Sequence, residues 1–116
     1  MTRLSVAATA KRADAAVIFA ALGDETRLRI VGRLCAEGPL SIMRLTTGAK
    51  VSRQAITKHL HALEEAGLAR ASRAGRESVW ELRAKRLANV QRYLDQISRD
   101  WDAALGRLRA FVEDEG

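Results

Sequence analysis

Residues 51–65 read VSRQAITKHLHALEE and predict one short helix with an apolar back and a polar, basic front. Apolar side chains recur at helical spacing at Ile56, Leu60 and Leu63. Ser52 is expected to cap the first turn, and Gly67 follows as a stop signal. The front carries guanidinium, amide, hydroxyl and imidazole groups, which match phosphates and base edges. We call this segment the reading helix; its candidate DNA-binding residues are Ser52, Arg53, Gln54, Thr57, Lys58 and His61.

The charge of the chain is concentrated around the reading helix. The 116 residues suit a single domain and include 20 Lys and Arg against 14 Asp and Glu, a net charge of +6. Between Arg44 and Arg76 there are seven basic and two acidic residues, whereas between Ala84 and Gly116 six of each balance. This distribution indicates a polyanionic partner. Charge alone fits RNA or an anionic membrane surface as well as DNA.

The elements before the reading helix predict a helix-turn-helix. A first helix is expected from about Lys11 to Leu22, where Gly23 ends it. Asp24 should cap a second helix that stops at Gly38 and Pro39. Its inward stripe is expected to consist of Leu28, Val31, Leu34 and Cys35. A short third helix over residues 41–47, capped by Ser41, and a Gly-containing turn then lead to the reading helix.

After Gly67 the period changes from 3.6 to 2. Residues 68–73 and 77–82 predict two strands joined by a turn at 74–76. Arg73 and Arg76 lie at the predicted tip, where they can meet a phosphate or a minor groove, or can be ordinary surface arginines on a solvated turn. Trp80 is expected to pack the hairpin against the reading helix.

The last predicted element is a helix from about Ala84 to Glu113, with an apolar stripe that extends over about 40 Å. A domain this small can hardly cover such a length, so we expect a second copy to pack on it. The alternative is a helix that folds back over its own domain. Trp101 is either dimer core or the lid of a small-molecule pocket. The predicted dimer interface comprises Leu87, Val90, Leu94, Ile97, Trp101, Leu105 and Leu108.

Four blocks of sequence resemble the winged helix-turn-helix repressors of the ArsR type. They are ALGDETRLRI at residues 21–30, VSRQAITKHL at 51–60, LEEAGL at 63–68 and RAGR at 73–76. The resemblance covers about residues 15–83 and implies a mainly α fold with a small β-hairpin (α+β), dimerised through its terminal helices. It also implies DNA contacts by Arg53, Gln54, Thr57 and Lys58, in agreement with the helical wheel.

The best-known members of that family sense metals or arsenicals, through paired cysteines before the helix-turn-helix or through Asp and His ligands on the last helix. This chain has LSIMRL at residues 40–45 and no histidine after His61. His59 and His61 point to different sides of a helix and cannot share an ion. We therefore expect no metal site and no cofactor, as in the metal-free branch of the family. The single cysteine, Cys35, suits a reducing cytosol and is expected to be a small core residue.

The sequence thus predicts a cytoplasmic, homodimeric transcriptional repressor that binds a pseudo-palindromic operator in double-stranded DNA. No nucleophile, acid–base or phosphate-loop motif indicates an enzyme, and no apolar run reaches membrane-spanning length. The expected organisation is a flexible tail at 1–10 rather than an export signal, a DNA-binding domain at 11–83 and a dimerisation helix at 84–116. Two alternatives stay open: a repressor that responds to an apolar small molecule near Trp101, and a helical protein-interaction module. The sequence leaves open the operator, any effector and the choice between repression and activation.

Overall fold

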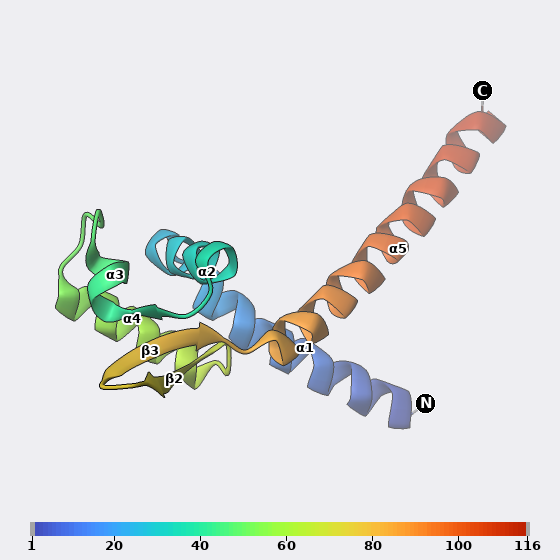
Figure 1. Cartoon of the computed structure of the whole chain (residues 1–116). Coiled ribbons are helices and arrows are strands. Elements are labelled where there is room, and N and C mark those ends of the chain that lie inside the picture. The colour runs from blue at the N-terminus through green and yellow to red at the C-terminus, as the bar shows by residue number, and fades with distance from the viewer. Residues whose placement is uncertain (1, 116) are drawn as a thin grey trace.

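The computed structural model describes residues 2–115 of the chain, and the side chains of residues 11–114. A helical body carries a small antiparallel sheet at one side, and a long helix leaves it at the other (Figure 1). Along this part of the chain the elements are α1 (Thr2–Leu22), α2 (Glu25–Glu37), β1 (Leu40–Ser41), α3 (Ile42–Thr46), α4 (Arg53–Glu65), β2 (Ala69–Ala74), β3 (Glu77–Leu82) and α5 (Ala84–Glu115). The predicted mainly helical fold with a helix-turn-helix and a β-hairpin is confirmed, and α4 is the reading helix.

The first helix begins earlier than the sequence pattern indicated. It starts at Thr2, so the predicted start at about Lys11 was wrong, and residues 2–10 of the predicted tail form the first part of α1. These residues have no apolar periodicity but include Ala7, Ala8 and Ala10 and lack Gly and Pro. High intrinsic helix propensity is enough to continue a helix that is already nucleated downstream.

Three predicted N-caps are confirmed. In each, a side-chain oxygen accepts a hydrogen bond from a backbone N–H of the first turn, which has no partner within the helix. The pairs are Asp24 Oδ1 with Arg27 N at 3.0 Å, Ser41 Oγ with Arg44 N at 3.2 Å, and Ser52 Oγ with Ala55 N at 3.1 Å. The beginnings of α2, α3 and α4 are therefore encoded locally.

The sheet has one strand more than predicted. β2 and β3 form the expected hairpin, with Arg70 opposite Glu81, and Gly75 has a φ of 65° in the turn. The short β1 adds to the other edge of β3, where Leu40 pairs with Trp80, and gives the order β1-β3-β2. Two residues after a proline are too few to show a strand period, so the sequence pattern missed β1.

The core lies between α4, α2 and the sheet. Ile56, Leu60 and Leu63 of α4 are each at most 1% exposed, as their spacing predicted. Trp80 is 4% exposed and closes the core from the side of β3. Because the whole apolar back of α4 is covered, the helix can present only its polar front to solvent.

The second helix is rotated relative to the prediction. Ile30 and Leu34 face the core, whereas Cys35 is exposed and Leu28 is 53% exposed. The predicted stripe was therefore wrong for Leu28 and Cys35. Both apolar rows of α2 have helical spacing, and only the docking of α2 onto α4 and the sheet selects which one is buried.

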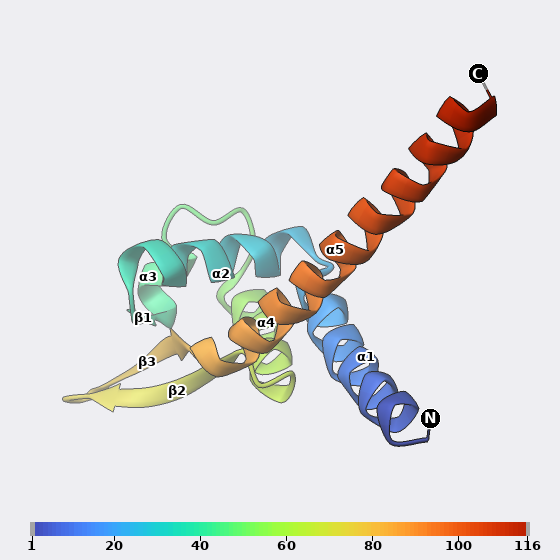
Figure 2. The same cartoon turned by 90° about the vertical axis from the view of Figure 1, so that its right-hand side faces the viewer.

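The last helix leaves the body of the domain. The molecule measures 67 × 35 × 20 Å, and Figures 1 and 2 show α5 projecting away from the tip of the hairpin. Its beginning packs on α1, where Val90 is 6% exposed and Arg86 Nη1 lies 3.3 Å from Asp14 Oδ1. All residues from 98 to 114 are exposed. The alternative of a helix folded back over its own domain is not what the structure shows. None of the helices among residues 2–115 combines the length and apolar character needed to cross a lipid bilayer.

Candidate nucleic-acid interface

The front of α4 forms an open, polar surface. Arg53, Gln54, Lys58 and the N-cap Ser52 are exposed, and Thr57 is half-buried at the edge of this face. Four of these residues line a shallow depression of about 550 Å³, namely Ser52, Arg53, Gln54 and Thr57. The structure thus brings the candidate residues from the first two turns of α4 together on one accessible face.

The polar groups on this face are free to bind a partner. Among the described side chains, those of Arg53, Gln54 and Lys58 have no hydrogen-bond or ion-pair partner. Thr57 Oγ1 donates to the carbonyl oxygen of Arg53 at 2.9 Å, so its two lone pairs stay available as acceptors. Because these donors have no partner within the described part of the chain, no intramolecular bond has to break before they bind phosphates or base edges.

The position of α4 is fixed by a group of polar side chains at the junction of α1 and α2. Arg27 Nε donates to His59 Nδ1 of α4 at 3.2 Å, and Arg27 Nη1 donates to the carbonyl oxygens of Ala20 and Ala21 at 3.4 and 3.2 Å. One guanidinium therefore joins the end of α1 to the middle of α4. The role of Arg27 was not predictable from the sequence pattern, because its partner His59 is 32 positions away.

Asp24 completes this junction. Its carboxylate accepts from the backbone N–H of Arg27 and lies 3.9 Å from His59 Nδ1. The hydrogen bond from that N–H, helped by the nearby His59 and Arg27 side chains, lowers the pKa of Asp24 below its ordinary value of 3.8. The ionised form is therefore the one that the folded chain stabilises.

We expect the substitution Asp24→Asn to lower the free energy of unfolding at neutral pH while the N-cap itself is kept. Because the folded pKa lies below 3.8, the wild-type advantage is fully present above that value and disappears as the pH falls through the lowered pKa. Urea denaturation at a series of pH values measures this difference. The matched control is Glu25→Gln, which removes an exposed carboxylate from the same turn. A wild-type advantage that persists unchanged in acid would contradict the role of the charge.

A second arginine holds the short helix α3. Arg33 Nη1 donates to the carbonyl oxygen of Arg44 at 2.9 Å, and Arg33 Nε lies 2.8 Å from Glu37 Oε2. The hydrogen bond from Arg33 lowers the pKa of Glu37 and, in turn, raises that of Arg33. Arg33 thus satisfies a carbonyl group at the end of α3, and α2 holds both helices of the helix-turn-helix.

The hairpin β2–β3, which we call the wing, stands beside α4. Arg73 and Arg76 are exposed at or near its tip, as predicted. The Arg70 guanidinium is 2.7 Å from Glu81 on the opposite strand and stiffens the base of the wing. The ring of His61 meets Trp80 edge-on, with the ring centroids 5.6 Å apart, and this contact joins α4 to β3. His61 therefore lies between the front of α4 and the wing.

The free part of α5 carries an exposed row of large apolar side chains. Leu94, Trp101 and Leu108 repeat at intervals of seven, and Leu105, Phe111 and Val112 widen the row; all six are 47–63% exposed. We call these six residues the α5 stripe. Ile97 lies beside them and is half-buried. Val17 and Phe19 of α1 are also exposed, at 52% and 39%.

Two residues of the predicted dimer interface pack against the core of their own chain. Val90 is buried within its own chain, and Leu87 packs against the same core. The prediction that Val90 faces a second copy was therefore wrong, because the beginning of α5 packs on α1, whereas Leu87 is only half-buried. The other five predicted residues, Leu94, Ile97, Trp101, Leu105 and Leu108, remain at least partly exposed.

No group of three or more His, Cys, Asp or Glu side chains suitable for a metal ion exists in the described part of the chain. Cys35 stands exposed on α2. His59 and His61 have separate partners, Arg27 and Trp80. The depression at the start of α4 is not lined by Trp101.

Comparisons with known proteins agree with this geometry. Residues 22–70 match the family model described as a helix-turn-helix domain. The HTH-type transcriptional regulator Rv2034 of Mycobacterium tuberculosis is 38% identical over 96 residues, which are 83% of this chain and 86% of that protein. Among solved structures, an ArsR-like transcriptional regulator from Rhodococcus sp. RHA1 has a TM-score of 0.75 and 38% identity, covering 86% of this chain and 93% of that one. A homodimeric winged helix-turn-helix DNA-binding domain from Mycobacterium bovis, Mb0332, has a TM-score of 0.61 and 24% identity, covering 79% of this chain and 83% of that one.

Proposed function

This chain belongs to the ArsR-type family of winged helix-turn-helix transcriptional regulators, and from that premise we propose that it is a homodimeric repressor that binds a pseudo-palindromic operator. As a member of the family it is a DNA-binding transcriptional regulator and not an enzyme. The proposal adds its oligomeric state, the form of its operator, the residues that contact DNA and the direction of regulation.

The observation that carries the proposal is the contrast between the two faces of α4. Its back is fully buried and is held by Arg27, whereas its front is largely exposed and basic. On that front the side chains of Arg53, Gln54 and Lys58 have no partner among the described side chains. We propose that this front enters a major groove. Arg53, Gln54 and Thr57 then meet base edges and phosphates near the start of the helix. Lys58 and Ser52 contact the backbone, and His61 lies toward the wing.

The wing extends the same surface. Arg73 and Arg76 are proposed to contact phosphates or the minor groove beside the site that α4 occupies. With Arg70 and Glu81 paired, the hairpin keeps Arg73, Arg76 and Glu77, a net charge of +1 at its tip. The wing therefore adds affinity that does not depend on base sequence.

The α5 stripe is proposed to pack against the same stripe of a second copy. Six large apolar side chains along one exposed helix face form a patch that a lone domain would present to water. The homodimeric state of the Mycobacterium bovis domain is in keeping with this arrangement. Because α5 projects away from the wing, pairing through it leaves both reading helices free (Figure 1). Two reading helices related by a twofold axis bind half-sites whose centres are about 34–36 Å apart, or a multiple of that distance.

The experiment that tests this function is the selection of bound sites from random duplex DNA, repeated at two salt concentrations. We expect a pseudo-palindrome whose two halves are enriched together, and an affinity that falls as the salt concentration rises. The selected site, placed over a bacterial promoter with a reporter gene, should be silenced when the protein is expressed in the cytoplasm. Enrichment of no motif would contradict sequence-specific binding, and activation of the reporter would contradict repression.

A further inference from the structure

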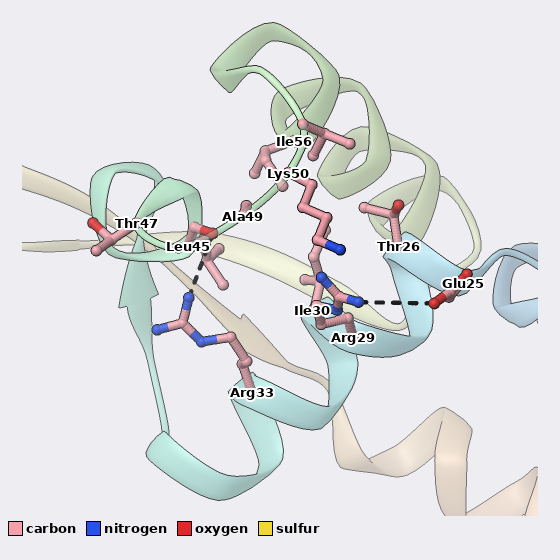
Figure 3. Close-up of a pocket in the computed structure, with 12 residues that line it drawn as sticks. Glu25, Thr26, Arg29, Ile30, Arg33, Leu45, Thr47, Ala49, Lys50 and Ile56 are labelled. Atoms are coloured by element: carbon pink, nitrogen blue, oxygen red, sulfur yellow. Dashed lines mark hydrogen bonds and ion pairs between the residues drawn. The ribbon is translucent and has the colours of Figure 1, made fainter.

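A second pocket lies behind the reading helix and has no place in the proposed DNA contacts. It has a volume of about 440 Å³ and opens between α2 and the turn that joins α3 to α4 (Figure 3). Ile30, Leu45 and Ile56 lie at its inner wall but are at most 3% exposed, so the apolar side chains that a ligand can reach are mainly the half-buried Ala49 and Val51 of the turn. Its size falls within the range of small-molecule sites in proteins.

The mouth of this pocket is positively charged. Arg29, from α2, and Lys50, from the turn, both line it, and in Figure 3 their side chains extend into the space between the two segments. Lys50 has no partner among the described side chains. Glu25 also lines the pocket and lies 3.7 Å from Arg29, but its side chain is 91% exposed, so this ion pair is weak and the mouth keeps a net positive charge. Arg33, also in the lining, is neutralised by Glu37.

We infer that this pocket binds a small organic anion that has one carboxylate and an apolar body. The carboxylate fits between Lys50 and Arg29, where charge-assisted hydrogen bonds form, and the apolar body packs on Ala49 and Val51 of the turn. A phosphate of DNA fits less well, because the sugar-phosphate backbone has no apolar group to pack on these two side chains. The pocket is distinct from the site near Trp101 that the sequence suggested.

Occupancy of the pocket acts on the proposed DNA-binding site, and this part of the inference rests on the proposed function. Ile56 belongs to α4, and Lys50 precedes its N-cap by two positions. A bound carboxylate neutralises positive charge beside the reading helix and so reduces its attraction for phosphates. The ligand therefore acts as an effector that releases the operator.

Octanoate is a suitable probe, since it joins a carboxylate to a short apolar chain. We expect saturable binding to the protein without DNA, measured by calorimetry, and much weaker binding of the neutral 1-octanol. Lys50→Gln and Arg29→Gln should each weaken octanoate binding by about tenfold, the usual worth of a hydrogen bond to a charged group. Lys85→Gln, an exposed lysine on α5, is the matched control and should leave the dissociation constant unchanged.

The inference is overturned if octanoate does not saturate the protein, or if Lys50→Gln and Arg29→Gln bind it as wild type does. Binding that disappears only when the α5 stripe is altered would place the probe on that stripe instead. A Lys50→Gln variant with normal octanoate binding but a smaller salt dependence on DNA would make Lys50 a phosphate contact. If octanoate binds but does not lower the affinity of the protein for its operator, the proposed effector role is wrong. Because calorimetry uses no DNA, failure of the proposed function leaves the test of the pocket intact.

Discussion

Replacing Trp101 and Leu105 together by lysine converts the protein to a monomer and lowers its affinity for a two-half-site operator by about 100- to 10,000-fold. Both side chains lie on the α5 stripe and are 63% and 49% exposed, so the single domain loses little packing. In a dimer, the second reading helix binds its half-site at a high effective concentration, and this gain disappears in a monomer. Sedimentation equilibrium gives the mass, and fluorescence anisotropy gives the affinity.

The matched control adds two lysines to the opposite face of α5. Gln96→Lys with Ala103→Lys changes the charge by the same amount at exposed positions outside the stripe. This variant should stay dimeric and bind the operator at least as well as wild type. The account of the stripe is contradicted if the Trp101 and Leu105 variant still sediments as a dimer, or if its operator affinity is that of wild type.

Replacing Gln54 by alanine reduces the discrimination between operator and random DNA by about 1–3 kcal/mol if Gln54 makes a bidentate base contact. Gln54 is exposed at the start of α4, and its amide has no partner among the described side chains. Loss of its donor and acceptor leaves a base edge unpaired in the operator complex, whereas binding to random DNA changes little. Competition between labelled operator and random duplex measures the ratio of the two affinities.

Lys58→Ala is the comparison variant for Gln54→Ala, because it removes a charge from the same face of α4. It should weaken binding to all sequences and reduce the slope of log affinity against log salt by about 0.9. The two variants therefore separate base recognition from phosphate binding. Equal losses on operator and random DNA for Gln54→Ala would contradict its proposed contact with a base.

Much of the site was accessible from the sequence because it is encoded locally. The caps Asp24, Ser41 and Ser52 bond to backbone groups three positions away, and the stripe of α4 recurs within two turns of the helix. Patterns that lie within a few positions of one another can be recognised from a single sequence. The ends of α4 and the exposure of its front followed from them directly.

The features that the sequence could not show depend on contacts between distant segments. Arg27 reaches His59 across 32 positions, and β1 exists only because β3 offers it an edge. The burial of Ile30 instead of Cys35 is decided by how α2 docks on its neighbours. Val90 has the right period for a dimer interface, yet the crossing of α5 over α1 covers it within its own chain. Periodicity identifies an apolar face but does not say what covers it.

The central claim is that two copies, joined through α5, hold their reading helices at a spacing matched to the DNA helix. The most direct test measures affinity for the selected operator after base pairs are inserted between its half-sites. We predict that about five additional base pairs, half a helical turn, reduce the affinity to that of a single half-site, and that about ten restore part of it. An affinity that is independent of the spacing would contradict the claim.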